Sequence, residues 1–144
     1  MQFIITAQAS ADKTEPDANG GLDEALLTAY MSFNEEMHKA GVLMASEGLN
    51  PAARGARIAV SKGKRYVVDG PIAESKELIG GFSFVEVGSL DEAISWALRA
   101  PSGLGTDDVL EVRQLTGAGD IPPEVLKIIK AAPTWSESVW QART

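Results

Sequence analysis

The fold is decided by the stretch Leu78-Ile79-Gly80-Gly81-Phe82-Ser83-Phe84-Val85-Glu86-Val87, which is followed closely by Ser89-Leu90-Asp91-Glu92. The aromatic and β-branched residues of the first part predict a strand over 78–87. Ser89 and Glu92 match the capping box, in which each of the two side chains satisfies a free backbone N–H at the start of a helix. This helix is expected to run to Ala100, because Pro101 cannot continue it. Its inward face is expected to consist of Leu90, Ala93, Ile94, Ala97 and Leu98. A strong strand therefore leads directly into a capped helix.

The spacing of apolar residues predicts the remaining elements around this unit. Residues 1–8 alternate as in a strand. Residues 23–40 form a helix with a buried stripe, and Gly41 ends it. The stripe consists of Leu26, Ala29, Tyr30, Phe33 and Met37. Further elements are strands at 42–49 and 109–115, a hairpin of 57–61 and 65–68, a turn at 117–120 and a short helix from Pro122-Pro123 to Lys130.

Without the hairpin and the last helix, the element order is β-α-β-β-α-β, which is typical of the ferredoxin-like α+β fold. The 144 residues are enough for one ordinary domain, which we place at residues 1–131. Residues 132–144 form a C-terminal tail that carries Trp135 and Trp140. This tail is expected to pack either on its own domain or on a dimer partner.

The predicted sheet has apolar residues on both faces, although a ferredoxin-like sheet has helices on only one. Phe82 and Phe84 point one way, whereas Val85 and Val87 point the other. The uncovered face would leave an apolar patch that is too large for a soluble monomer. A second copy is the simplest cover, because two-fold dimers are the commonest oligomers. The sequence therefore predicts a homodimer that pairs sheet to sheet, with the tryptophan-bearing tail as a competing cover.

Composition excludes several classes of protein. Apolar residues make up 44% of the chain and charged residues 23%, so the chain is neither disordered nor membrane-embedded. No signal peptide is evident and cysteine is absent, which together predict a cytoplasmic protein without disulfides. The net charge of −7 disfavours a nucleic-acid partner. One basic segment stands apart: it is either a solvated hairpin or an anion-binding patch. Its basic residues are Arg54, Arg57, Lys62, Lys64 and Arg65.

The loop Asp69-Gly70-Pro71-Ile72-Ala73-Glu74-Ser75-Lys76-Glu77 joins two strands and contains four ionisable side chains. Loops fixed by a rigid scaffold often carry sites. Asp69 either accepts hydrogen bonds from the amides of the turn or acts as a general base at a pocket rim. Glu74 and Lys76 project to one side of an extended loop. They form either a solvated ion pair or a ligand site in which Lys76 holds a carboxylate.

Three further residues are candidates for a site. His38 is the only histidine and shares a helix face with Asn34, one turn earlier. It is either a structural side chain or an acid–base catalyst, since histidine titrates near neutrality. Glu47 alternates with apolar neighbours and is expected to point into the interior. It would need a partner there, and Arg113 or Asn34 would serve.

Neither a metal nor a cofactor is predicted. One histidine and no cysteine leave carboxylates as metal ligands, and no spacing resembles a calcium loop. The glycine-rich pieces at 103–105 and 117–119 do not match a phosphate-binding loop and are interpreted as turns.

The chain resembles the YCII-related proteins, and within them the subgroup named for its Asp-Gly-Pro-Phe motif. The motif stands here as Asp69-Gly70-Pro71-Ile72, with isoleucine in place of phenylalanine. The resemblance extends over roughly residues 1–130. Further matches are Phe33-Asn34-Glu35-Glu36-Met37, Ala40-Gly41-Val42-Leu43, Glu47-Gly48-Leu49, Ala73-Glu74-Ser75-Lys76-Glu77, Gly80-Gly81-Phe82, Leu90-Asp91-Glu92-Ala93-Ile94, Trp96-Ala97 and Glu111-Val112-Arg113.

The resemblance implies a dimeric α+β barrel with a pocket between sheet and helices. Some relatives resemble degradative enzymes for small aromatic compounds. Others are linked to extracytoplasmic-function sigma factors, which implies a regulatory role. Some use a histidine–aspartate pair, but the sequence context of that pair is absent around His38.

Two hypotheses follow for the function. The first is a dimeric module that binds a small ligand, or regulates, with its pocket near the Asp69-Gly70-Pro71 loop. The alternative is a cofactor-free enzyme that uses acid–base chemistry on a small metabolite, aromatic or otherwise. The sequence favours the first, because one histidine and no cysteine leave few catalytic groups. It does not name the ligand.

Overall fold

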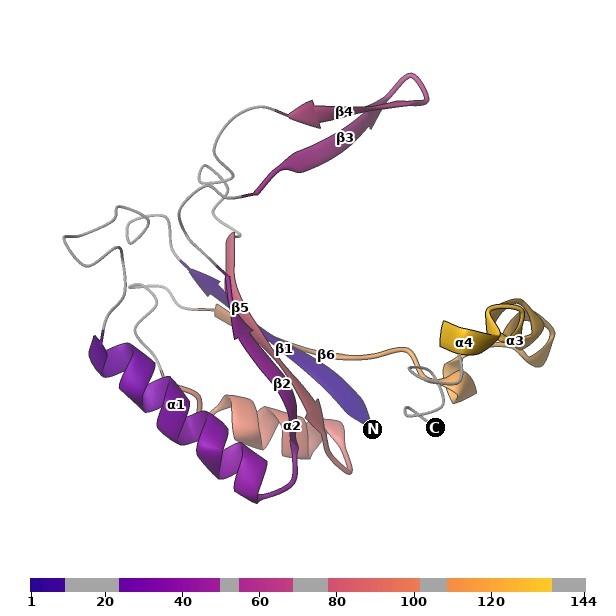
Figure 1. Ribbon diagram of the computed structural model, residues 1–144. Coiled ribbons are helices and arrows are strands. Elements are labelled where there is room, and N and C mark those ends of the chain that lie inside the picture. Colours follow the sequence, from indigo (N-terminus) through magenta and orange to yellow (C-terminus); the bar gives the residue numbers. More distant parts are fainter. Residues whose placement is uncertain (10–23, 50–54, 69–77, 102–108, 136–144) are drawn as a thin grey trace.

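A computed structural model describes residues 1–9, 24–49, 55–68, 78–101 and 109–135 (Figure 1). The fold is α+β with an antiparallel sheet, and it is consistent with the predicted ferredoxin-like class. The strands are β1 (Gln2–Ala9), β2 (Leu43–Gly48), β3 (Arg57–Ser61), β4 (Lys64–Val68), β5 (Leu78–Glu86) and β6 (Val109–Gln114). The helices are α1 (Glu24–Lys39), α2 (Leu90–Ala97), the 3-10 turn η3 (Ala118–Asp120), α3 (Pro123–Lys130) and the short α4 (Pro133–Trp135).

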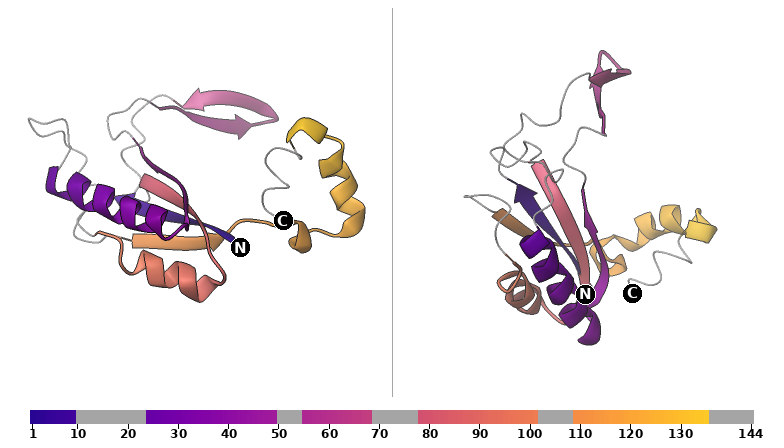
Figure 2. Two further views of the ribbon diagram at one scale, coloured as in Figure 1. Left: turned by 60° about the horizontal axis from the view of Figure 1, so that its bottom comes forward. Right: turned by 60° about the vertical axis from the view of Figure 1, so that its left-hand side comes forward.

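Four strands form one sheet in the order β2-β5-β1-β6, and neighbouring strands are antiparallel. The central strand β1 therefore pairs with β5 on one side and with β6 on the other. Helices α1 and α2 lie together on one face of this sheet, as the two further views in Figure 2 also show. The hairpin of β3 and β4 is a separate two-stranded sheet, inserted in the chain between β2 and β5 as predicted.

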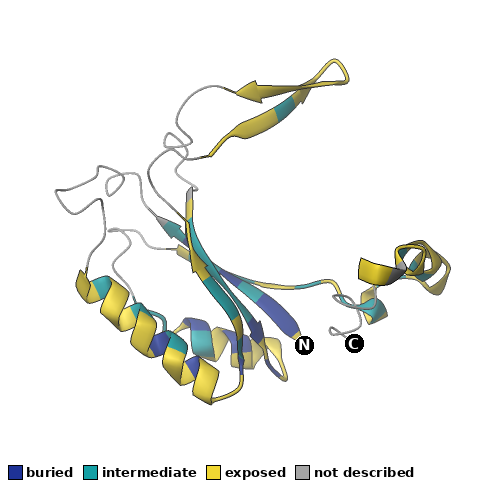
Figure 3. Cartoon of the chain, viewed as in Figure 1, coloured by how far each residue is buried: buried dark blue, intermediate teal, exposed yellow. Residues whose placement is uncertain are grey.

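The hydrophobic core fills the layer between the sheet and the two helices. Phe3, Met37 and Val85 are completely buried there. Around them lie Ile5, Phe33, Val42, Val87, Ala93 and Ala97. The ring of Phe33 also packs on Trp96 at a centroid distance of 6.2 Å. Figure 3 shows that buried residues gather in this layer.

The buried face of α2 differs from the prediction. Leu90, Ala93, Ile94, Ala97 and Leu98 were expected to face inward, but the surfaces of Leu90, Ile94 and Leu98 are 47%, 39% and 81% exposed. The small residues Ala93 and Ala97 are the buried ones. Alanine lets a helix approach the sheet closely, so the inward face centres on this pair. Ala29 of α1, predicted in the buried stripe, is exposed as well.

Local signals place the helix ends much as expected. The amide of Glu92 donates to Ser89 Oγ at 3.2 Å, and Glu92 Oε2 accepts from the amide of Gly88 at 2.8 Å. The reciprocal bond of the capping box thus reaches one residue further back than the pattern predicts. Helix α2 ends at Ala97 rather than Ala100, because the last turn continues with i→i−3 bonds, such as that from Arg99 to the carbonyl of Trp96.

Two segments extend away from the body of the domain. The β3–β4 hairpin and the segment containing α3 both lie on the side of the sheet opposite α1 and α2 (Figures 1 and 2). The hairpin turns at Lys62 and Gly63, whose φ values of 50° and 75° suit a tight two-residue hairpin turn. Most of the described side chains in both segments are exposed (Figure 3).

Candidate functional site

The helix-free face of the four-stranded sheet is the most distinctive surface that the structure describes. Thr6 lies between Ile5 and Ala7, which are buried toward the helices, so the side chain of Thr6 points to the other face. Residues directly opposite one another on antiparallel strands share a face. The strand registers therefore define an open face. It consists of Ile4, Thr6, Ala45, Glu47, Phe82, Phe84, Glu111 and Arg113.

The open face has an apolar centre and charged edges. One row across the sheet is Ala45, Phe84, Ile4 and Arg113, and the next row is Glu47, Phe82, Thr6 and Glu111. The two phenylalanine rings meet edge to face, with centroids 5.3 Å apart and planes at 66°. Glu47, Glu111 and Arg113 lie on the edge strands and are exposed, whereas the central residues are half-buried. The arrangement is an apolar floor bordered by two carboxylates and one guanidinium.

The candidate residues of the loop fall outside the described part of the chain. Asp69, Glu74 and Lys76 lie within residues 69–77, between the end of β4 at Val68 and the start of β5 at Leu78. The start of β5 is at the same end of the sheet as the C-terminal ends of β1 and β2 and the start of β6. The loop thus joins the sheet at the end that carries the Glu47–Phe82–Thr6–Glu111 row.

The sheet separates the remaining candidates. Asn34 and His38 belong to α1, on the helix-covered side, where Asn34 is half-buried and His38 is exposed. Glu47 belongs to the open face and is exposed. The structure therefore does not bring Glu47 together with Asn34 or His38, and the described residues show no convergence of these three side chains.

The expectation that Glu47 points into the interior was wrong. β2 is an edge strand, and its residues Ala45 and Glu47 face the side opposite the described helices α1 and α2. Arg113, one of the predicted partners of Glu47, lies on β6 at the opposite edge. Three interstrand spacings, about 14 Å, separate the two strands. Within one subunit these two side chains serve as opposite borders of one surface rather than as an ion pair.

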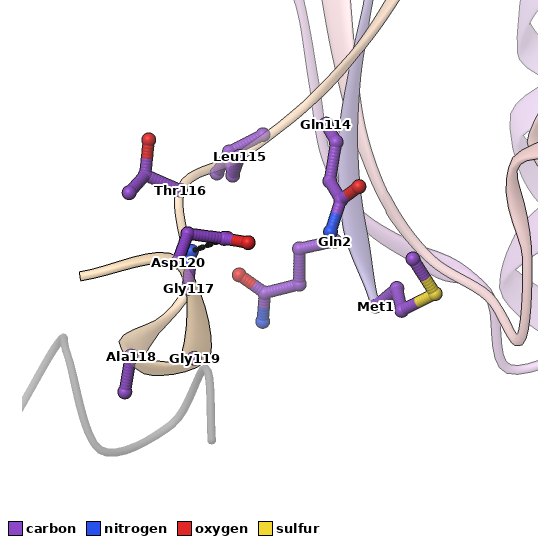
Figure 4. A pocket seen from close by; sticks show the side chains of 9 residues that line it. All are labelled: Met1, Gln2, Gln114, Leu115, Thr116, Gly117, Ala118, Gly119 and Asp120. Carbon is purple, nitrogen blue, oxygen red and sulfur yellow. Dashed lines mark hydrogen bonds between the residues drawn. The ribbon is translucent and has the colours of Figure 1, made fainter. Parts of the chain in front are cut away.

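A second polar feature, which the sequence did not single out, lies at the other end of the sheet (Figure 4). It is a hollow of about 350 Å³ between the start of β1 and the turn after β6. It is lined by Met1, Gln2, Gln114, Leu115, Thr116, Gly117, Ala118, Gly119 and Asp120.

Several polar groups around this hollow already serve the fold. Asp120 Oδ2 accepts from the amide of Gly117 at 2.8 Å, and the terminal amine of Met1 donates to the carbonyl of Val87 at 2.9 Å. Gln2 Nε2 donates to Glu86 Oε2 at 3.1 Å. These bonds hold the end of the sheet together, so this hollow is a weaker site candidate than the open face.

Two further properties of the described residues bear on function. Within the described ranges, no three histidine or acidic side chains gather closely enough to hold a metal ion. Among the helices that the structure describes, none is both long and apolar enough to cross a bilayer.

The model of the YCII-related domain matches residues 1–117, so the chain belongs to the YCII-related family. An uncharacterised protein of Rhizobium meliloti (strain 1021) is 31% identical over 102 residues, which cover 69% of this chain and 82% of that protein. The assignment to the Asp-Gly-Pro-Phe subgroup remains a prediction.

Among solved structures, a similar chain is 5-chloro-2-hydroxyhydroquinone dehydrochlorinase from Burkholderia phenoliruptrix AC1100, in complex with 2,5-dihydroxybenzoquinone. It shares 17% sequence identity and has a TM-score of 0.37. The match covers 84% of this chain and all of that one. A likeness at this level has no bearing on substrate or reaction here.

Proposed function

We propose that this YCII-related domain is a homodimeric module that binds a small, flat, largely apolar ligand on the open face of its sheet. The observation that supports this most is the edge-to-face pair of Phe82 and Phe84 on a face that none of the described helices covers. Ligand sites are usually apolar surfaces with a few polar groups at their margin, which describes this floor and its charged border. Association with a second copy would enclose the floor and remove it from water.

The loop that carries Asp69, Glu74 and Lys76 supplies the polar part of the proposed site. It enters β5 at Leu78, four residues before Phe82. In this proposal Asp69 accepts a hydrogen bond from the ligand, and Lys76 and Glu74 stand at its polar end. Regulation linked to a sigma factor is compatible with a binding module, and it stays a prediction from the family resemblance.

The described residues favour binding over the enzymatic alternative. An acid–base enzyme needs two ionisable groups that converge on one reacting atom. His38 and Glu47, the two ionisable candidates within the described residues, are separated by the sheet. Catalysis would therefore have to come from the loop, and we take ligand binding as the conclusion.

Thermal shift with benzylamine, phenol and benzoate tests this proposal, because the three probes share a ring and differ in charge. Benzylamine and phenol can donate a hydrogen bond to Asp69 and benzoate cannot, so we expect benzylamine and phenol to raise Tm more than benzoate. A larger increase of Tm with benzoate would instead indicate that Lys76 binds an anionic group at the polar end of the ligand.

The variant Asp69→Asn should lose the ligand-induced shift, whereas the control Asp91→Asn should keep it. Asp91 is exposed on α2, on the opposite side of the sheet. Equal shifts in wild type and Asp69→Asn, or no shift with any of the three probes, would contradict a ligand site beside this loop.

A further inference from the structure

The β3–β4 hairpin exposes large hydrophobic side chains that nothing in the described part of the chain covers. The register pairs Ile58 with Val67 and Val60 with Arg65, so Ile58, Val60 and Val67 share one face of the hairpin. Their exposed fractions are 63%, 65% and 60%. A two-stranded hairpin alone is marginally stable in water. This face is therefore suited to packing against another apolar surface.

The charges of the hairpin are opposite to those of the open face. Arg57, Lys62, Lys64 and Arg65 are all exposed, and residues 55–68 contain no acidic side chain. This local excess is unusual in a chain whose net charge is −7. The open face carries the exposed carboxylates of Glu47 and Glu111 on its two edge strands. Of these basic residues, Arg65 pairs with Val60 and shares the apolar face of the hairpin, Lys62 lies at its turn, and Arg57 and Lys64 lie on its other face. An apolar strip with Arg65 and Lys62 at its turn end thus matches an apolar floor with acidic borders.

We propose that the hairpin of one subunit docks on the open face of a second copy of this chain. Ile58, Val60 and Val67 cover the pair of phenylalanines from above, and Arg65 and Lys62 lie near Glu47 and Glu111. This inference rests on the proposed homodimer and names the segment that closes its binding site. The contact is reciprocal, so a two-fold dimer makes it twice.

The direction of the hairpin supports an exchange between subunits. It extends away from its own domain, on the side toward which the open face points (Figures 1 and 2). Its charge is complementary to the acidic chain from which it extends, which favours a second copy over an unrelated partner. As a consequence, the proposed ligand site on Phe82 and Phe84 is incomplete in a single subunit, because the hairpin of the other subunit covers it.

Reversing the charges on each surface tests this contact. One variant carries Lys62→Glu with Arg65→Glu on the hairpin, and the other carries Glu47→Lys with Glu111→Lys on the sheet. All four positions are exposed, so each variant should keep the wild-type circular dichroism spectrum and urea midpoint. Each variant alone brings like charges together twice per dimer. We expect its dimer dissociation constant, measured by sedimentation, to rise roughly 100-fold.

Mixing the two variants should restore the dimer, because in the mixed pair both contacts are again between opposite charges. The matched control Glu24→Lys with Glu35→Lys changes the net charge as the sheet variant does, but on the exposed surface of α1. It should remain a dimer and should show no preference for the hairpin variant.

The outcomes separate this inference from the proposed function. The docking of the hairpin is overturned if the wild type is a dimer and both charge variants dimerise as strongly as it does. It is also overturned if mixing the two variants does not restore the dimer. In either case the subunits would associate through another contact. A wild type that stays monomeric at every concentration overturns both proposals. Binding of inorganic phosphate to the wild-type hairpin without any effect of the variants on dimerisation also overturns the docking.

Discussion

On one face of the four-stranded sheet, Phe3, Ile5 and Val85 lie under α1 and α2 with less than a tenth of their surfaces exposed. On the other face, Phe82 and Phe84 are only half-buried and stand beside exposed carboxylates. Both faces are apolar at the centre, but within the described part of the chain only the first has a helical layer. The covered face therefore stabilises the subunit, and the open face remains for association and ligand binding.

The largest effect is expected on the covered face. Met37→Ala removes a completely buried side chain from the contact between α1 and the sheet. Deleting such a side chain loses apolar burial and leaves a cavity, so the free energy of unfolding should fall by about 2–5 kcal/mol. Urea unfolding measures this. The control Met31→Ala, at a residue 53% exposed on the same helix, should change little. Equal losses for the two variants would contradict the placement of the core.

The second effect is expected on the open face, and it changes the equilibrium between monomer and dimer rather than that between folded and unfolded subunit. Phe84→Ala removes one of the two contacting rings from the proposed dimer floor. Truncation of an aromatic anchor typically costs about 2 kcal/mol or more of binding free energy. We expect this loss to appear in the dimer dissociation constant, measured by sedimentation. If Phe84→Ala weakened subunit folding as much as Met37→Ala and left association unchanged, the distinction between the two faces would fail.

The smallest effect concerns how α2 is held on the covered face. Ser89→Ala removes the oxygen that accepts from the amide of Glu92, and loss of a helix cap costs about 1 kcal/mol. The urea midpoint should fall accordingly. Ser95→Ala is the matched control, because Ser95 Oγ only donates to the carbonyl of Asp91 within the helix. A control that destabilises as much as Ser89→Ala would show that the cap is not the cause.

Much of the architecture could be predicted from local patterns. The alternation of Phe3 and Ile5, the helical stripe ending in Phe33 and Met37, and the turn glycine Gly41 each depend on neighbours in the chain. Gly41 does adopt a positive φ of 73°, as expected of a residue just past a helix end. The candidate site was less predictable, because its members come from four different strands.

Two errors show what local patterns lack. Glu47 was expected inside together with Leu43, but the register shift between Leu43 and Ala45 interrupts the alternation and puts Glu47 on the face opposite Leu43, which packs against the core. Leu90, Ile94 and Leu98 were expected inside together with Ala93 and Ala97, but only the two alanines are buried, because the spacing of apolar residues does not show how wide the contact with the sheet is. The open face itself was accessible to reasoning: its residues alternate with the buried ones on β1. Its charged border, with Glu111 and Arg113, required the strand order.

The amino-acid sequence by itself determined the order of strands and helices, the helix caps and the alternation along each strand, because these depend on residues close together in the chain. The tertiary structure alone decided that the sheet order is β2-β5-β1-β6 and that Glu47 and Arg113 stand at opposite edges. These features arise from contacts between distant segments. Such contacts depend on which surfaces pack most closely. In α2, for example, it is Ala93 and Ala97 that are buried.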